Sequence, residues 1–349
     1  MKPLEVLIVY NEPALAVDHP DYASEAGVLD SVERVSATLA ARGHRVRPWG
    51  IGQSLRDFAV ELAGQNGSDV AFNLFEGFGG VGRGEAEVAG MVELAGYPIT
   101  GSPPECLALV RDKARTKWLL AGAGIRTAAF ELFADDEPID DMRLERLMGQ
   151  APLIVKPAHE DASLGIGPQS VVDNHADLLE QVASVRQRYG AVLVEQFIAG
   201  REFNAAVLAL PTPQLLPVAE IEFCQKLSPA ARIVTYDAKW AAGSADDLAT
   251  PVRCPARLDQ ATHDRIEEVA LAAFRHAGCR DFARVDLRMD DRGDLYVLEV
   301  NGNPDIGPSG GFDRALQAAG VAYDDFIERL VRAAHQRRSP IAGKIAADH

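Results

Sequence analysis

Short apolar runs alternate with helical patterns over the first hundred residues. Residues 7–10 and 70–74 are two such runs. Between them, residues 28–39 carry valines and a leucine at the three- and four-residue spacing of one helix face, and Gly43 follows as a helix stop. Strands that alternate with helices are typical of a parallel sheet covered by helices. The pattern predicts one α/β domain over residues 1–110.

Beyond residue 103 strands and longer helices follow one another without regular alternation, which is typical of an α+β arrangement. The fold class is therefore α/β followed by α+β. We expect a central lobe over residues 111–200, a C-terminal lobe over residues 201–335 and a tail over residues 336–349. The predicted helices span residues 85–94, 111–120, 177–189 and 260–278, and the predicted strands span residues 97–99, 153–156, 192–195, 203–210, 215–223, 282–289 and 295–301.

The chain of 349 residues contains 51 acidic and 35 basic side chains, which gives a net charge of −16 at pH 7. This excess argues against a nucleic acid or an anionic membrane as the main partner, because both are negative themselves. No apolar stretch approaches the ~18 residues of a membrane span, and the first residues lack a secretory apolar run, so we expect a cytoplasmic protein. Any phosphate must be held by local cations against the overall field.

The two strands around Asp-Arg-Gly at residues 291–293 form a predicted hairpin. If Arg292 and Gly293 form the turn, Asp286 lies opposite Glu299, and Arg284 lies opposite Asn301, all on one face. The other face then fills a core with Val285, Leu287, Leu298 and Val300.

Two carboxylates directly across a ladder repel each other unless a positive charge lies between them. Oxygen ligands at this spacing suit Mg²⁺, which binds through a few carboxylates and substrate phosphates, and Asn301 before a glycine and proline turn is a natural third ligand. The alternative is that Arg284 bridges Asp286 and Glu299 on a solvated surface. The hairpin alone leaves both interpretations open.

Several motifs in a fixed order resemble one family of enzymes. Arg284, Asp286, Glu299 and Asn301 stand in the frame R-x-D…L-E-x-N-x-x-P, preceded by R-D-K and V-K-P segments. The combination resembles the ATP-grasp carboxylate-amine ligases and is most similar to the D-alanine:D-alanine ligase branch, over about residues 70–330. The resemblance implies an ATP-grasp fold, with a parallel-sheet domain before two lobes that enclose ATP.

The resemblance also implies roles for single residues. Lys113 and Lys156 match the phosphate-binding lysines, and residues 158–167 match the flap over the phosphates, in which Ser163 belongs to the usual serine pair. Without the family, Lys113 is an ordinary helix residue, and residues 192–198 are a buried strand. The remaining matches are Glu195, Phe197 and Ile198 at the adenine hinge, Glu202 at the ribose, Lys239 at the γ-phosphate, Arg284 at the oxyanion, and Asp286, Glu299 and Asn301 as ligands of two Mg²⁺ ions, with Mn²⁺ as an alternative ion.

The implied reaction has two steps and needs positioning and charge neutralisation more than a protein nucleophile. A substrate carboxylate attacks the γ-phosphorus of ATP, which gives an acyl phosphate and ADP. An amine then attacks the acyl carbon, forms an amide and releases phosphate. The implied substrates are amino acids or amines, and the family implies a homodimer.

The substrate half departs from the family pattern. The candidate for the ammonium-binding glutamate, Glu25, comes late, and Glu76 stands where the family has a histidine. Ala162 stands where the family has the first serine of the flap pair, and Trp240 replaces the loop tyrosine that partners this serine. Asp305 lies where the second substrate's carboxylate would bind. Ser309 is a further weak substrate candidate.

Added carboxylates disfavour an anionic second substrate and favour a cationic or neutral amine. We therefore expect a ligase of the same chemistry with a different substrate pair. The alternatives are a true D-alanine:D-alanine ligase of peptidoglycan synthesis, a nucleotide-binding regulator without catalysis, and a kinase or carboxylase built on the same lobes.

Overall fold

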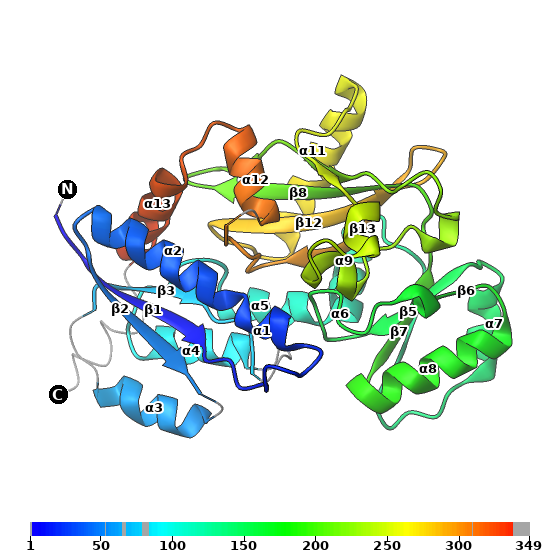
Figure 1. Cartoon of the computed structure of the whole chain (residues 1–349), viewed down its shortest axis with the longest axis horizontal. Coiled ribbons are helices and arrows are strands. Elements are labelled where there is room, and N and C mark those ends of the chain that lie inside the picture. The colour runs from blue at the N-terminus through cyan, green and yellow to red at the C-terminus, as the bar shows by residue number, and fades with distance from the viewer. Residues whose placement is uncertain (1, 53, 65–67, 79–83, 309, 338–349) are drawn as a thin grey trace.

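The computed structural model describes residues 2–52, 54–64, 68–78, 84–308 and 310–337 (Figure 1). The first sheet is parallel in the order β2 (Arg45–Ile51), β1 (Glu5–Asn11), β3 (Val70–Leu74). Its helices are α1 (Tyr22–Ala26), α2 (Val28–Ala41), α3 (Leu55–Gly64) and α4 (Glu85–Leu94). The predicted parallel sheet with covering helices is confirmed.

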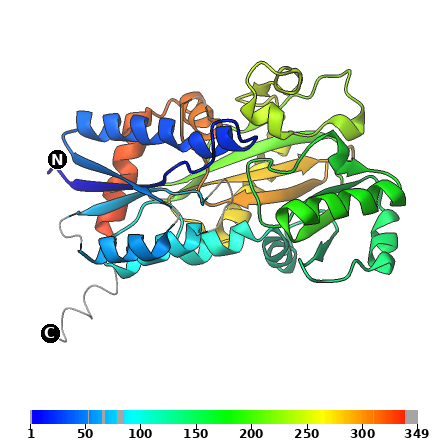
Figure 2. The ribbon, with the colours of Figure 1, turned by 60° about the horizontal axis from the view of Figure 1, so that its bottom comes forward.

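Alternate residues of β1 fill two different cores, because successive side chains of a strand point to opposite faces. Val6 and Ile8 pack with α2 and with the last two helices, α12 (Gly311–Ala318) and α13 (Tyr323–Gln336). Leu7 and Val9 pack with α3, α4 and the start of α5 (Pro104–Arg111). Figure 2 shows the sheet between α2 on one side and these helices on the other. The end of the chain thus returns to the first sheet.

One predicted strand of this region is wrong. Residues 97–99 form no strand, and only an isolated bridge joins Ile99 to Ala71. The ladder stops there because Pro98 has no N–H to donate.

The second sheet is antiparallel in the order β4 (Phe130–Phe133), β7 (Val192–Gln196), β5 (Leu153–Pro157), β6 (Val171–Val172). The helices α7 (Asp141–Met148) and α8 (His175–Tyr189) close its core. A short 3₁₀ turn over residues 168–170 precedes β6.

The third sheet is antiparallel in the order β11 (Val252–Arg253), β10 (Ala219–Ile221), β8 (Arg201–Ala209), β12 (Phe282–Met289), β13 (Leu295–Asn301), and β9 (Pro213–Leu215) also pairs with β8. It packs on α11 (Gln260–His276) and on the ends of α5 and α6 (Lys113–Gly122). The short helices α9 (Tyr236–Trp240) and α10 (Ala245–Ala249) and a 3₁₀ turn over residues 229–231 lie in the long connection from β10 to β11.

Two further boundaries differ from the sequence prediction. The predicted helix over residues 111–120 begins at Lys113, because Asp112 is extended and caps α6 by accepting a hydrogen bond from the N–H of Arg115. The predicted strand over residues 215–223 is divided into β9 and β10, with Pro217 between them.

The β12–β13 hairpin has the predicted register where the chemistry lies. Asp286 is opposite Glu299, and Arg284 is opposite Asn301. A β-bulge after Asp286 shifts the register by one residue, so that Leu287 pairs with Val297 and Met289 with Leu295. Leu298 consequently lines a cleft instead of filling the core, and Val297 takes the buried position. The prediction that Leu298 belongs to the core is wrong for this reason. The predicted two-residue turn at Arg292 and Gly293 is wrong, because it would pair Met289 with Tyr296.

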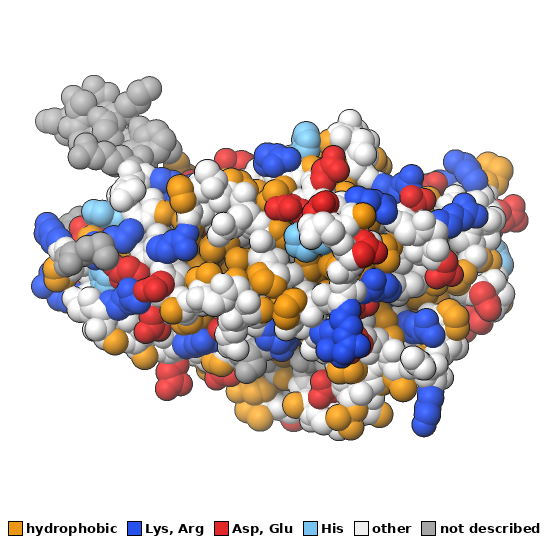
Figure 3. Space-filling view, turned by 90° about the horizontal axis from the view of Figure 1, so that it is seen from above, with side chains coloured by type: hydrophobic (Ala, Val, Ile, Leu, Met, Phe, Trp, Pro, Cys, Tyr) orange, Lys and Arg blue, Asp and Glu red, His pale blue; other side chains and the backbone are white. Residues whose placement is uncertain are grey.

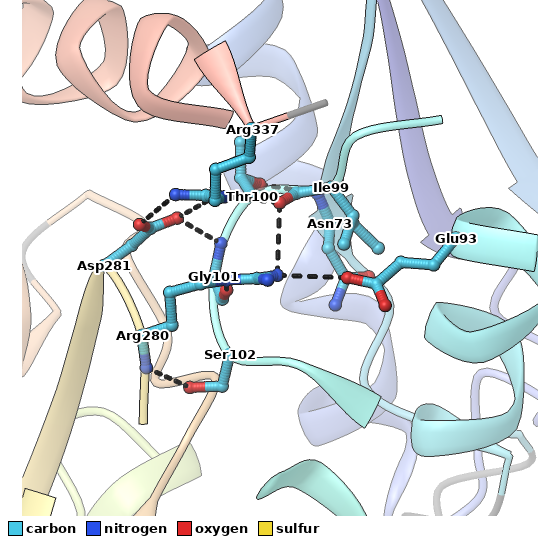
Figure 4. A network of polar contacts seen from close by, with 9 residues as sticks. All are labelled: Asn73, Glu93, Ile99, Thr100, Gly101, Ser102, Arg280, Asp281 and Arg337. Atoms are coloured by element: carbon cyan, nitrogen blue, oxygen red, sulfur yellow. Dashed lines mark hydrogen bonds and ion pairs between the residues drawn. The ribbon is translucent and has the colours of Figure 1, made fainter. Parts of the chain in front are cut away.

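A polar network joins the first sheet's edge to the start of β12 and the end of α13 (Figure 4). Asp281, buried and left-handed at φ 61°, accepts hydrogen bonds from both terminal nitrogens of Arg337, at 2.6 and 2.7 Å, and from the N–H of Gly101 at 2.9 Å. Arg280 donates to the carbonyl oxygen of Gly101 at 2.7 Å and to Glu93 at 3.3 Å. The network thus joins the segment after the first sheet to the start of β12 and to the end of α13.

Asp281→Asn is expected to lower the free energy of unfolding by ~2 kcal/mol, because it removes the charge that Arg337 binds while an asparagine still tolerates the left-handed backbone. Urea unfolding measures the effect. Asp325→Asn is the matched control, since its ion pair with Arg42 is exposed and its loss is expected to change stability by less than ~0.5 kcal/mol. Equal effects of the two substitutions would contradict a central role for the network.

No helix among the described residues has the length and apolar character to span a membrane.

Candidate active site

A cleft of about 700 Å³ lies where residues of all three sheets meet. Asn11 of β1, Lys156 of β5 and Asp286 of β12 all contribute to its wall. The cleft brings together sixteen residues predicted from the sequence, namely Glu25, Glu76, Lys113, Lys156, Ser163, Glu195, Phe197, Ile198, Glu202, Lys239, Trp240, Arg284, Asp286, Glu299, Asn301 and Asp305. Ser309 lies outside the described residues.

One wall presents the oxygen atoms of the hairpin. Arg284 donates to both carboxylate oxygens of Asp286 at 2.8 Å, and Asn204 on β8 donates to Asp286 Oδ1 at 2.8 Å. The Asp286 side chain is 9% exposed, so this face is not the solvated surface of the alternative interpretation. Two carboxylates and an amide oxygen are the hard donors that Mg²⁺ prefers, and Asp286, Glu299 and Asn301 therefore fit such an ion.

Cations from other elements surround Glu299. Burial by itself would raise the pKa of Glu299, but Lys113, Lys156, Arg284 and Lys239 outweigh it and lower that pKa to about 2. The Nζ of Lys113 lies 3.7 Å from Glu299 Oε2. Glu299 is thus ionised at neutral pH and able to act as a metal ligand.

Two lysines, one from α6 and one from β5, hold the same buried carboxylate. Lys156 is 2.5 Å and Lys117 is 2.9 Å from the two oxygens of Glu195. Burial would raise the pKa of Glu195, and the two ammonium groups lower it. The sequence prediction missed Lys117, although it follows Lys113 by four residues and so shares its helix face.

The flap of residues 158–167 closes over the cleft through backbone contacts. Ala162 and Ser163 have positive φ values of 57° and 61°. The indole N–H of Trp240 donates to the carbonyl oxygen of Ala162 at 3.1 Å, so a side chain to backbone bond joins α9 to the flap where the family has a tyrosine–serine bond. From the flap, Asp161 accepts a hydrogen bond from Lys113 at 2.6 Å.

The far end of the cleft is apolar around one acidic group. Phe197 and Ile198 follow β7, and Glu202 is the second residue of β8 and is 8% exposed. Arg288, two residues after Asp286 on the same face of β12, binds Glu202 and also lines the cleft. The sequence prediction missed Arg288, although the alternation Arg284, Asp286, Arg288 pointed to it.

The opposite end is rich in carboxylates. Glu25 accepts hydrogen bonds at Oε2 from the N–H groups of Ala14 and Leu15, and its buried Oε1 has no hydrogen-bond partner among the described residues. Asp305 Oδ1 accepts from Ser31 at 3.1 Å and from the N–H of Gly307 at 2.7 Å.

Glu76 and Glu85 lie at the same end and keep their protons more readily than ordinary glutamates. Enclosure by the cleft walls, and second the charge of Asp305, raise the pKa of Glu76 to about 8. Burial, and second Asp161, raise the pKa of Glu85. The sequence prediction included Glu76 but missed Glu85 and Asp161.

The structure has a parallel-sheet domain followed by two antiparallel sheets. These two sheets face each other across a cleft, with lysines on one side and carboxylates on the other. This arrangement defines the ATP-grasp class. The sequence model of a family described as D-ala D-ala ligase C-terminus matches residues 119–332, more than half of the chain. The chain belongs to the D-alanine–D-alanine ligase family.

Relatives and solved structures agree with this assignment. A D-alanine–D-alanine ligase of Desulforudis audaxviator is 34% identical over 88% of this chain and 94% of its own. An uncharacterized protein of Sinorhizobium fredii, y4sG, is 34% identical over 77% of this chain and 76% of its own. The structure of a D-alanine–D-alanine ligase from Bacillus anthracis complexed with ATP has the same fold, with a TM-score of 0.75 at 19% identity over 95% of this chain and 98% of that one.

Glu299→Gln is expected to lower ATP-dependent turnover by at least ~100-fold, because it removes one charged oxygen donor opposite Asp286 while keeping the shape of the side chain. ADP release measures turnover, and thermal unfolding checks the fold. Glu222→Gln, at a half-exposed ion pair with Arg253 outside the cleft, is the control and is expected to keep full turnover. Full activity of Glu299→Gln would overturn the metal-ligand assignment.

Proposed function

We propose that this protein is an ATP-dependent carboxylate-amine ligase that forms an amide through an acyl phosphate, releases ADP and phosphate, and accepts an amine other than D-alanine. Membership of the D-alanine–D-alanine ligase family supports the reaction class. The observation that carries the proposal is the pairing of facing walls, with Lys113 and Lys156 on one side and Asp286 and Glu299 on the other.

Each group in the cleft has a role in the proposed first step. Lys113, Lys156 and Lys239 bind the phosphates of ATP, and Glu195, Phe197 and Ile198 enclose the adenine. Asp286, Glu299 and Asn301 would hold Mg²⁺, and the bound ion would neutralise part of the negative charge of the phosphates. The flap, which includes Ser163, orients the attacking carboxylate of the first substrate toward the γ-phosphorus.

In the proposed second step the neutral form of the amine attacks the acyl carbon, the C–N bond forms as the C–O bond to phosphate breaks, and the nitrogen's proton leaves with the phosphate. Arg284 lies beside Asp286 with its side chain 14% exposed. Desolvation would lower its pKa, but Asp286 and Glu299 outweigh this effect and raise that pKa. A permanently charged guanidinium stabilises the negative charge that develops on the carbonyl oxygen.

The acidic end of the cleft supports a cationic amine as the second substrate. Glu76 and Asp305 depart from the family pattern, and the charge of Asp161 helps to raise the pKa values of Glu76 and Glu85. Two carboxylates near each other cannot both ionise cheaply, but a bound ammonium group would stabilise the charged form of each. An anionic substrate carboxylate at this place would meet repulsion instead.

Peptidoglycan D-alanine–D-alanine ligation is the narrower alternative, and relatives with that name favour it. A regulator without catalysis is less consistent with the site, because two facing carboxylates at Asp286 and Glu299 are unfavourable unless they bind a cation. The homodimer implied by the family stays a prediction.

A screen of ADP release across D- and L-amino acids, diamines and other amines tests the substrate proposal, with amide products identified by mass spectrometry. Basic amines are expected to give turnover at least ~10-fold above D-alanine, because they can pair with the acidic end. Turnover with D-alanine as the only accepted substrate would overturn the proposal and favour the cell-wall enzyme.

The pH dependence of amine binding tests Glu76. Because its pKa is raised to about 8, Glu76 is neutral below that pH and ionised above it, so the KM for a cationic amine is expected to fall between pH 7 and 9. Glu76→Gln is expected to flatten this dependence and to raise KM ~10-fold at pH 9. Glu87→Gln, an exposed residue on α4, is the control. An unchanged pH profile in Glu76→Gln would place the amine elsewhere.

A further inference from the structure

We propose that Arg288 is a positioning residue that makes Glu202 selective for the ribose hydroxyls of the nucleotide. This inference rests on the adenine-nucleotide part of the proposed function and is independent of the identity of the amine.

Arg288 lies directly across the β8–β12 ladder from Glu202. Its Nε and Nη2 both donate to the same oxygen, Glu202 Oε2, at 2.8 and 2.6 Å. Glu202 Oε1 accepts no hydrogen bond from the described residues, although Glu202 lines the cleft. The carboxylate is thus held by one oxygen and presents the other.

The remaining donors of Arg288 are used on the backbone. Nη1 donates to the carbonyl oxygen of Ile198 at 2.8 Å, and Nη2 donates also to the carbonyl oxygen of Arg232. The rings of Phe197 and Phe223 lie 4.7 and 5.4 Å from the guanidinium carbon. A planar guanidinium with five donors can hold this geometry, whereas a lysine cannot make all of these bonds at once.

Charge explains why this arrangement is needed. Glu202 is buried, and burial raises its pKa while Arg288 opposes that effect. An ionised carboxylate with one free oxygen is an acceptor for a ribose hydroxyl group. Arg288 opposes, without cancelling, the rise that burial causes in the pKa of Glu202. Its hydrogen bonds set the orientation of Glu202 and fix the hinge carbonyl of Ile198 relative to it.

The inference is tested by calorimetric binding of ADP and of 2′,3′-dideoxy-ADP with Mg²⁺, without any ligase substrate. The measured quantity is the ratio of the two dissociation constants. The wild-type protein is expected to bind ADP about 10-fold more tightly than the dideoxy compound, which is the effect of one charge-assisted hydrogen bond. Arg288→Met is expected to reduce that ratio to about 2 or less, through a loss of ADP affinity.

Two further variants separate positioning from a structural role. Glu202→Gln is expected to reduce the ratio in the same way, and adding Arg288→Met to it is expected to change the ratio no further. Arg288→Lys is expected to give an intermediate ratio and decides the case if Arg288→Met fails to fold. Arg253→Met, on an ion pair outside the cleft, is the matched control and is expected to leave both affinities unchanged.

The proposal would be overturned if Arg288→Met weakened the binding of ADP and of the dideoxy compound equally. It would also be overturned by a wild-type ratio near 1, or by an Arg288→Lys variant that keeps the full wild-type ratio. A failure of the ligase proposal is distinguishable, because it would appear as the absence of amide product while the binding ratio keeps its predicted pattern.

Discussion

The cleft depends on one electrostatic constraint, which is that Asp286 and Glu299 face each other across a ladder and need positive charge nearby. Arg284 on the same strand supplies part of it at Asp286. Lys113 approaches Glu299 from α6, which belongs to a different part of the fold. The position of α6 against β13 therefore matters, and Asp112, which starts α6 by capping it, places Lys113 at that point.

The same constraint shows how a chain of net charge −16 can hold a phosphate. Basic and acidic side chains are interspersed on the face of the molecule shown in Figure 3, so no broad basic surface is available there to a polyanion. The cations that would bind phosphate are concentrated in the cleft, where Lys113, Lys156 and Lys239 lie near Glu299. Local placement, rather than total charge, sets the affinity for a phosphate.

The sequence pattern predicted most of the fold because alternation and helical spacing are local signals. Period-two alternation predicted that Asp286 faces Glu299, but the predicted two-residue turn is wrong: Met289 pairs with Leu295, and the bulge after Asp286 restores the predicted register. The bulge that moves Leu298 into the cleft was not predictable, because a bulge depends on contacts across the sheet. Residues 97–99 form no strand because Pro98 lacks an N–H, a feature that the sequence itself contains.

The site was predictable where residues carry a family motif and less so where they act through a partner. Lys117 holds Glu195 and Asn204 holds Asp286, and neither lies in the R-D-K, V-K-P or R-x-D…L-E-x-N-x-x-P segments. Asp161 and Glu85 join the acidic end only when the chain folds. A crystal structure with a non-hydrolysable ATP analogue and Mn²⁺ tests the central claim most directly, through the anomalous signal of the ion. We expect manganese bound by Asp286, Glu299 and Asn301 beside the phosphates, whereas a nucleotide bound without an ion at these residues would refute their role as metal ligands.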